Sequence, residues 1–165
     1  MSVSLLPNLI TEKLTDLTPE LLNARNIRLL MLDFDNTIVP YTTDTPTDAV
    51  EAWIAMMRES SIKLCVVSNS KRDRVKHFCK AYGLPCITHA KKPFSKGISQ
   101  CLELFELSPS VCALVGDQIF TDTLGANCAG ITSILVKAIN NHNFWLKARH
   151  VLELPFIYFA RKRRL

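Results

Sequence analysis

The chain has 165 residues, of which 48% are hydrophobic and 21% charged, and these proportions are typical of a globular protein of one domain. They exclude an intrinsically disordered chain, and since no stretch approaches the ~20 consecutive apolar residues of a membrane-spanning helix, we expect no such helix. The formal net charge of +5 is uneven: from position 137 onward seven Lys or Arg accompany one acid, giving +6, so the first 136 residues carry −1.

The predicted elements alternate between strands and helices. Strands are predicted where short apolar runs are bounded by polar residues, and helices where apolar residues recur every three or four positions. The order is a short helix from Thr18, a strand at 28–32, a helix from Thr45 or Thr47, a strand at 63–67, a helix at 72–82, a strand at 86–87, a helix from Ser95, a strand at 111–115, a helix from Thr121 or Asp122 to about 129, and a strand at 132–136. Gly83 and Gly130 are expected to end the helices before them.

This alternation predicts an α/β protein with a parallel, five-stranded central sheet that helices cover on both faces. We expect a single domain over residues 1–165, with a core at about 27–137 and a basic, amphipathic C-terminal segment at about 150–165. In sheets of this kind, ligands bind beyond the carboxyl ends of the strands. The polar residues that directly follow the predicted strands are therefore the candidate site.

Candidate functional residues follow four of the predicted strands in chain order. They are Asp33 and Asp35 after the first strand, Ser68 and Asn69 after the second, Lys92 in the loop after the third, and Asp117 after the fourth. An Asp-x-Asp pair alone is often only a polar turn that leaves a sheet. The recurrence of suitable polar residues at the other strand ends is what favours a functional site.

Hydrolysis of a phosphate monoester needs these residue types. The ester carries a charge near −2, so a carboxylate can approach it only when a cation neutralises that charge, and Mg²⁺ prefers carboxylate oxygens and water. Asp33 and Asp117 can share the ion, with the backbone carbonyl of Asp35 as a third oxygen. A lysine adds a positive charge, and Ser68 can donate a hydrogen bond to the phosphoryl group. Asp33 would attack phosphorus to form an aspartyl-phosphate, and Asp35 would act first as acid and then as base.

The motifs resemble, in order and register, those of the haloacid dehalogenase (HAD) superfamily, over residues from about 28 to 136. The resemblance implies a Rossmann-like three-layer sandwich, with Asp33 as nucleophile and Asp35 as acid/base. It implies a Mg²⁺ cofactor bound at Asp33, Asp35, Asp117 and Asp122, where Asp122 orients the metal or its waters. It implies a substrate phosphate bound by Thr37, Ser68, Asn69 and Lys92. Lys91 could take the role of Lys92, but the residue next to Pro93 is preferred.

Many members of this superfamily insert a lid domain, and here only residues 38–44 separate the first motif from the next helix. We therefore expect a capless core with an open site, which suits a large substrate or one presented at a surface. The closest resemblance is to the YqeG-like, class IIIA branch and to mitochondrial phosphatidylglycerophosphate phosphatases. It is carried by Leu6-Pro7-Asn8, by Thr18-Pro19-Glu20-Leu21 and by Lys92-Pro93. It implies a lipid phosphate monoester substrate and a role in phospholipid biosynthesis.

The C-terminal segment has three interpretations. An apolar and aromatic stretch at 154–160 is followed by four basic residues at 161–164. This pattern suits an anionic membrane surface, but the apolar residues could equally pack on the core and leave a solvated basic end. The basic end could also contact nucleic acid, yet no helix-turn-helix or aromatic-studded strand accompanies it, so we do not expect such a partner.

Other functions remain open at this point. One is a soluble sugar or nucleotide phosphatase, and another is a non-catalytic assembly factor that keeps the fold. The six cysteines have no metal-binding or redox spacing, so we expect all of them to be reduced in a cytoplasmic protein, with peripheral attachment to the inner face of a membrane left open. The sequence does not indicate an oligomeric state.

Overall fold

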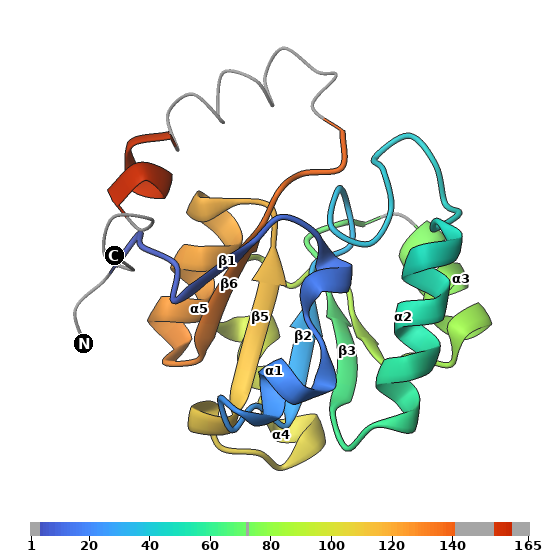
Figure 1. Ribbon diagram of the computed structural model, residues 1–165, viewed down its shortest axis with the longest axis horizontal. Coiled ribbons are helices and arrows are strands. Elements are labelled where there is room, and N and C mark those ends of the chain that lie inside the picture. The colour runs from blue at the N-terminus through green and yellow to red at the C-terminus, as the bar shows by residue number, and fades with distance from the viewer. Residues whose placement is uncertain (1–3, 72, 141–153, 160–165) are drawn as a thin grey trace.

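Six short apolar runs form one parallel sheet in a computed structural model that describes residues 4–71, 73–140 and 154–159 (Figure 1). The strand order is β1-β6-β5-β2-β3-β4. The strands are β1 (Leu9–Thr11), β2 (Leu29–Leu32), β3 (Lys63–Val67), β4 (Cys86–Ile87), β5 (Cys112–Gly116) and β6 (Thr132–Val136). All four residues of the central strand β2 are buried, because both of its faces are covered.

The expectation of five strands is wrong by one strand. The additional strand is β1, which pairs with β6 at one edge through Leu9 and Ile134. Three residues are too few to show the alternation or the apolar run by which a strand is predicted from sequence. The sheet therefore begins well before position 27, where the core was expected to start.

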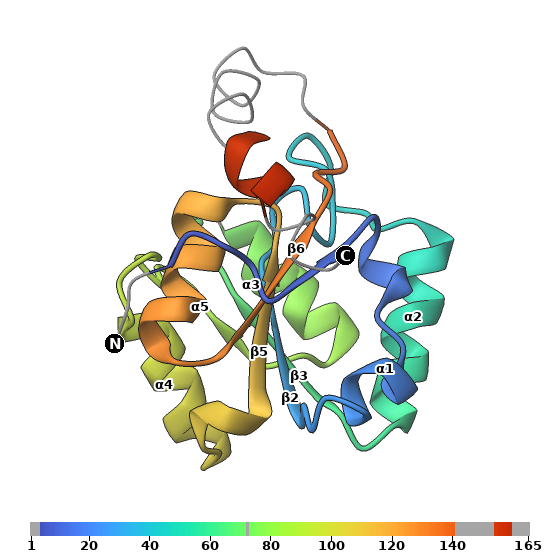
Figure 2. The same ribbon diagram turned by 60° about the vertical axis from the view of Figure 1, so that its left-hand side comes forward.

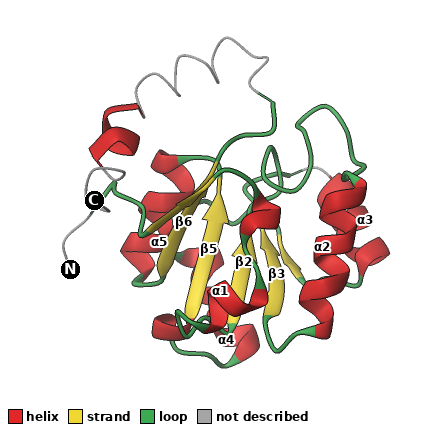
Figure 3. Cartoon of the chain, viewed as in Figure 1, coloured by secondary structure: helices red, strands yellow, loops and turns green. Residues whose placement is uncertain are grey.

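Helices flank the sheet in chain order (Figure 3). They are α1 (Pro19–Asn23), α2 (Asp48–Glu59), α3 (Asp73–Tyr82), α4 (Lys96–Phe105) and α5 (Leu124–Ala129), with single turns at Leu14–Asp16, Pro109–Val111 and Ile119–Thr123. Thr18 and Thr47 cap α1 and α2 as N-caps, each accepting a hydrogen bond from the backbone three residues on. Gly130 ends α5 with a φ of 72°, as expected from its place in the sequence.

Two differences concern helix starts. α4 begins directly after Ser95, but the Ser95 side chain makes no capping hydrogen bond. The helix expected from Thr121 or Asp122 is preceded by a wider π-helical turn over Ile119–Thr123, and α5 starts at Leu124. This wide turn lies just after β5 and carries Asp122, so it belongs to the candidate site.

The core consists of two apolar layers, one on each face of the sheet (Figure 2). Side chains of α1, α2 and α3 cover one face, and side chains of α4 and α5 cover the other. Trp53 of α2 is 3% exposed, and its indole nitrogen donates a 2.7 Å hydrogen bond to the carbonyl of Leu17. It is a packing residue, as predicted. The three-layer α/β sandwich is therefore confirmed.

The topology places a switch point between β2 and β5. From β2 the chain adds β3 and β4 on one side, and it then crosses over to add β5 and β6 on the other. Asp33 and Asp117 directly follow these two adjacent strands, and the Asp33 amide donates a 2.9 Å hydrogen bond to the carbonyl of Val115. Ligands of open α/β sheets bind at such a point.

The C-terminal helix at residues 154–159 lies at the same end of the sheet (red in Figure 1). The ring of Phe156 lies 6.2 Å from that of Phe120, in the turn before α5, while Tyr158 and Phe159 are exposed. The basic residues at 161–164 fall outside the described residues, as does Trp145. Among the described residues, none of the helices has the length and apolarity needed to cross a bilayer. All six cysteines are free thiols.

Candidate active site

The loop after β2 makes a tight turn that turns two carboxylates toward the end of the sheet. Asn36 adopts a φ of 63°, which asparagine tolerates better than most residues, and its amide donates a 2.7 Å hydrogen bond to the carbonyl of Val39. Asp33 and Thr37 on either side of the turn are 7% and 2% exposed. The amide of Ile139, after β6, donates a 3.0 Å hydrogen bond to the Asn36 carbonyl and joins the loop to that segment.

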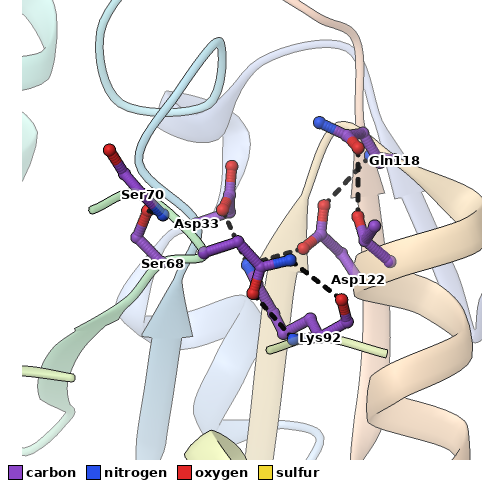
Figure 4. Close-up of polar contacts among 8 residues, drawn as sticks. Asp33, Ser68, Ser70, Lys92, Gln118 and Asp122 are labelled. Atoms are coloured by element: carbon purple, nitrogen blue, oxygen red, sulfur yellow. Dashed lines mark hydrogen bonds and ion pairs between the residues drawn. The ribbon is translucent and has the colours of Figure 1, made fainter. Parts of the chain in front are cut away.

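Lys92 lies at the centre of the buried charges (Figure 4). Its Nζ is 2.6 Å from Oδ1 of Asp33 and 2.7 Å from Oδ1 of Asp122. Lys91 is exposed, so the structure places the lysine next to Pro93 at the carboxylates, as the motif predicted.

Asn69 holds Lys92 in place by a pair of hydrogen bonds to its backbone. The Asn69 amide nitrogen donates to the Lys92 carbonyl at 2.8 Å, and the Lys92 amide donates to Oδ1 of Asn69 at 2.7 Å. The side chain is thus engaged in positioning the lysine loop. Its predicted contact with substrate phosphate stays a prediction, as does that of Ser68, which is buried and accepts a 3.1 Å hydrogen bond from the Ser70 amide (Figure 4).

Three buried carboxylates come together opposite the lysine. Asp33, Asp117 and Asp122 each offer an oxygen within 4.8 Å of the others. Asp122 can approach because residue 116 is glycine: a Cβ there would lie 2.3 Å from the Asp122 carboxyl group. The Gln118 amide donates to the other oxygen of Asp122 at 3.2 Å and fixes its orientation.

The electrostatics of this cluster fit a divalent cation. Three carboxylates against one ammonium leave about two uncompensated negative charges in a buried site. Burial raises the pKa of Asp33 to about 7, despite the opposing charge of Lys92, and Asp122 pushes it further upward. Burial lowers the pKa of Lys92, but the charges of Asp122 and Asp33 outweigh it and hold that pKa above its ordinary value. A divalent ion would neutralise the excess, and carboxylate oxygens are the ligands that Mg²⁺ prefers.

Arg74, in the first turn of α3, is a residue to which the sequence gave no role. Its guanidinium lies 3.3 Å from Oδ1 of Asp35 and 2.7 Å from Oδ1 of Asp44. It also donates to the carbonyls of three loop residues, namely Pro40, Tyr41 and Thr43. Arg74 therefore fixes the predicted acid/base relative to the loop beside it. Its only sequence signal is a position four residues beyond Ser70, in an otherwise solvent-facing helix start.

The comparisons with known proteins agree with this geometry. The profile of the family described as "Mitochondrial PGP phosphatase" matches residues 2–139 of this chain. The chain belongs to this family of phosphatases. A Bacillus subtilis (strain 168) protein named "Probable phosphatase YqeG" is 37% identical over 131 residues, covering 79% of this chain and 76% of that protein.

Solved structures share the fold of this PGP phosphatase family member at low identity. The cobalt-bound deoxy-D-mannose-octulosonate 8-phosphate phosphatase of Haemophilus influenzae has a TM-score of 0.55 and 12% identity, over 78% of this chain and 89% of that one. An uncharacterized protein from Listeria monocytogenes serotype 4b has a TM-score of 0.57 and 16% identity, over 72% of this chain and 84% of that one. These likenesses establish a HAD-type α/β core.

This family member has no inserted domain over its site within the described residues. Between Asp33 and Lys92 those residues form only α2, β3, α3 and β4, which all belong to the sandwich. The site is bordered instead by loops, among them the one that Arg74 holds and the one that contains the exposed Phe94. Shielding of the reaction from water therefore depends on the bound substrate and its surroundings.

Proposed function

We propose that this chain is a Mg²⁺-dependent phosphomonoesterase that forms an aspartyl-phosphate on Asp33, and that it acts on a lipid phosphate such as phosphatidylglycerophosphate. One observation carries the mechanism. A buried Asp33 lies between the ammonium of Lys92, 2.6 Å away, and the carboxylates of Asp117 and Asp122. A carboxylate so placed can accept a cation and can meet an incoming phosphoryl group whose charge is already neutralised.

The metal would be held by the carboxylates of Asp33 and Asp117 and by the backbone carbonyl of Asp35, with Asp122 orienting it. When bound, it supplies positive charge that lets the anionic nucleophile approach the anionic phosphoryl group. Lys92 adds a further positive charge to the phosphoryl oxygens. Thr37, Ser68 and Asn69 complete the proposed contacts to the phosphate, through side-chain hydroxyls or backbone N–H groups.

The reaction then takes two balanced steps. In the first, an oxygen of Asp33 forms a bond to phosphorus as the bond to the leaving oxygen breaks, and Asp35 gives that oxygen its proton. In the second, Asp35 removes a proton from water, the water oxygen bonds to phosphorus, and the bond to Asp33 breaks. Phosphate leaves and both aspartates return to their starting states. Arg74 holds Asp35 where both proton transfers occur.

Three features support a lipid substrate at a membrane surface. The family matched is described by a phosphatase of PGP. The site lacks an enclosing domain among the described residues. The helix at 154–159 presents exposed Leu154, Tyr158 and Phe159 at the catalytic end of the sheet, next to the basic residues of the sequence at 161–164. Aromatic side chains beside basic ones suit the interface of an anionic bilayer.

The test is phosphate release from phosphatidylglycerophosphate in vesicles, beside soluble sugar and nucleotide phosphates, with and without Mg²⁺. We expect Mg²⁺-dependent release that is fastest on the lipid, and a loss of most activity in Asp33→Asn. Turnover of soluble esters alone would retain the mechanism and remove the lipid substrate. If the wild type hydrolyses none of these esters, the chain is a non-catalytic member of the fold.

A further inference from the structure

Two adjoining hollows lie beside the catalytic loop. The larger has a volume of about 410 Å³, and its walls are mainly apolar; they include Leu14, Thr37, Ile38, Pro40, Val50 and Ile139. The smaller has a volume of about 350 Å³, and its walls include Ile10, Asp117, Leu135, Leu154 and Ile157. Both volumes fall in the range of small-molecule sites. The two hollows share Glu12, Lys137 and Ala138, so they meet at the segment after β6.

Each hollow reaches a residue of the candidate active site. Asp117, one of the three clustered carboxylates, lines the smaller hollow. Thr37, four residues after Asp33, lines the larger one. A molecule with its phosphate at Asp33 can therefore extend from the carboxylates along Lys137 and Ala138 into the apolar walls.

Thr37 supplies a second sign that the larger hollow accepts a ligand. Its side chain is 2% exposed, yet its hydroxyl has no hydrogen-bond partner among the residues that the structure describes. A buried hydroxyl without a partner costs about 1–3 kcal/mol, so native proteins keep few of them. A ligand oxygen at this position would satisfy the group.

The charges at the junction favour an anionic ligand with an apolar part. Lys137 is exposed where the hollows meet, and Lys13 lies on the wall of the larger one. The amide of Lys137 donates to the Glu12 carbonyl at 3.3 Å, and that of Ile139 donates to Asn36, so this wall is fixed to β1 and to the catalytic loop. The shape is thus built into the sheet end.

We infer that these hollows bind the leaving group of the substrate, and that this group carries a hydrocarbon chain, which lies in the larger hollow. The inference rests on the proposed phosphatase activity and adds to it a subsite within the protein. Chain recognition here does not require a membrane. A bilayer that merely presents the headgroup, or a segment of this chain that fills the hollow, would give no such recognition in free solution.

The experiment uses monomeric, straight-chain alkylphosphonates and alkyl phosphates, from ethyl to octyl, in free solution with Mg²⁺. Titration calorimetry of the wild type with the phosphonates, which cannot be hydrolysed, measures binding without turnover. We expect affinity to rise with chain length, by up to about fourfold per buried methylene. For the esters we expect KM to fall by the same steps while kcat stays level, because contacts to the chain bind substrate and transition state alike.

Two substitutions test the location. Ala138→Trp fills the junction, and Ile139→Glu places a charge on the apolar wall at a side chain that is 43% exposed and so tolerates change. Each should lower the octyl-to-ethyl affinity ratio at least tenfold. Ala81→Trp, at an exposed position of α3, is the matched control and should retain the ratio.

Failure of this inference is distinct from failure of the proposed function. Phosphonate affinity that is independent of chain length, or a ratio that both substitutions leave intact, overturns the chain-binding subsite even if every ester is hydrolysed. Affinity that rises with chain length while no ester is hydrolysed supports the subsite and rejects the phosphatase mechanism.

Discussion

The guanidinium of Arg74 lies 3.3 Å from the carboxylate of Asp35, and the same side chain binds Asp44 and three carbonyls of the intervening loop. The arginine is largely buried, with a side chain that is 9% exposed, and its guanidinium lies 5.1 Å from the centre of the Phe34 ring. One side chain thus fixes both the predicted proton donor and a loop bordering the site. A positioned donor matters most when the leaving group is a poor one.

Arg74→Lys should therefore lower kcat for alkyl phosphates by about tenfold to a hundredfold, because lysine cannot span the same partners and a small displacement of a catalytic group is costly. The loss should be much smaller for p-nitrophenyl phosphate, whose leaving group needs no proton. Steady-state kinetics on both esters would measure the difference. Equal losses on the two would mean that Arg74 supports only the folded structure. The exposed Arg58, replaced by lysine, is the control.

Replacing Lys92 should harm both activity and stability. Lys92→Met removes the partner of Asp33 and Asp122, and removing one member of a buried ion pair typically costs about 3–5 kcal/mol. Urea denaturation in EDTA would measure that loss, and saturating Mg²⁺ should restore part of it. The neighbouring Lys91→Met is the matched control, since Lys91 is exposed and should be nearly neutral. Equal effects of both substitutions would contradict the central role of Lys92.

The raised pKa of Asp33 makes the metal-free protein less stable as pH rises. Burial raises this pKa from 3.8 to about 7, so between these values the native state holds a proton that the unfolded state has released. In EDTA, Asp33→Asn should thus be more stable than the wild type at pH 8, and the gap should shrink by on the order of 2–3 kcal/mol toward pH 5. Denaturant melts across this range measure the gap. Mg²⁺ should close or reverse it at pH 8, and a gap independent of pH would refute the assignment.

The sequence predicted most of the site because its residues follow strands whose order could be derived. The motif residues Asp33, Lys92 and Asp117 are each attached to a strand end or its loop, and parallel strands bring those ends together. β1 was missed because its three residues carry no period. Arg74 was missed because its partners, Asp35 and the carbonyls of residues 40–43, are set by the path of a loop. Loop paths depend on tertiary contacts that have no repeat in the sequence.

Gly116 shows the same limit, and it yields the last prediction. In the sequence it is one more glycine before an aspartate, suited to a tight turn. In the structure its missing Cβ leaves the space that the Asp122 carboxyl group occupies, 2.3 Å from where that atom would stand. Gly116→Ala must displace Asp122 from Lys92 and from the other carboxylates, because real Cβ atoms do not approach so closely. We expect Mg²⁺ affinity to fall at least tenfold, with activity falling alongside it.

The control for Gly116→Ala is Gly130→Ala, at the end of α5. Gly130 has a φ of 72°, so alanine there is strained, but nothing lies within 4 Å of the added atom. Both substitutions should destabilise the protein, by about 1 kcal/mol or more, whereas only Gly116→Ala should weaken Mg²⁺ binding. Calorimetric titration with Mg²⁺ at a temperature where both variants are folded separates the two effects. Unchanged affinity in Gly116→Ala would mean that Asp122 does not contribute to the metal site, and the ion would then depend on Asp33 and Asp117.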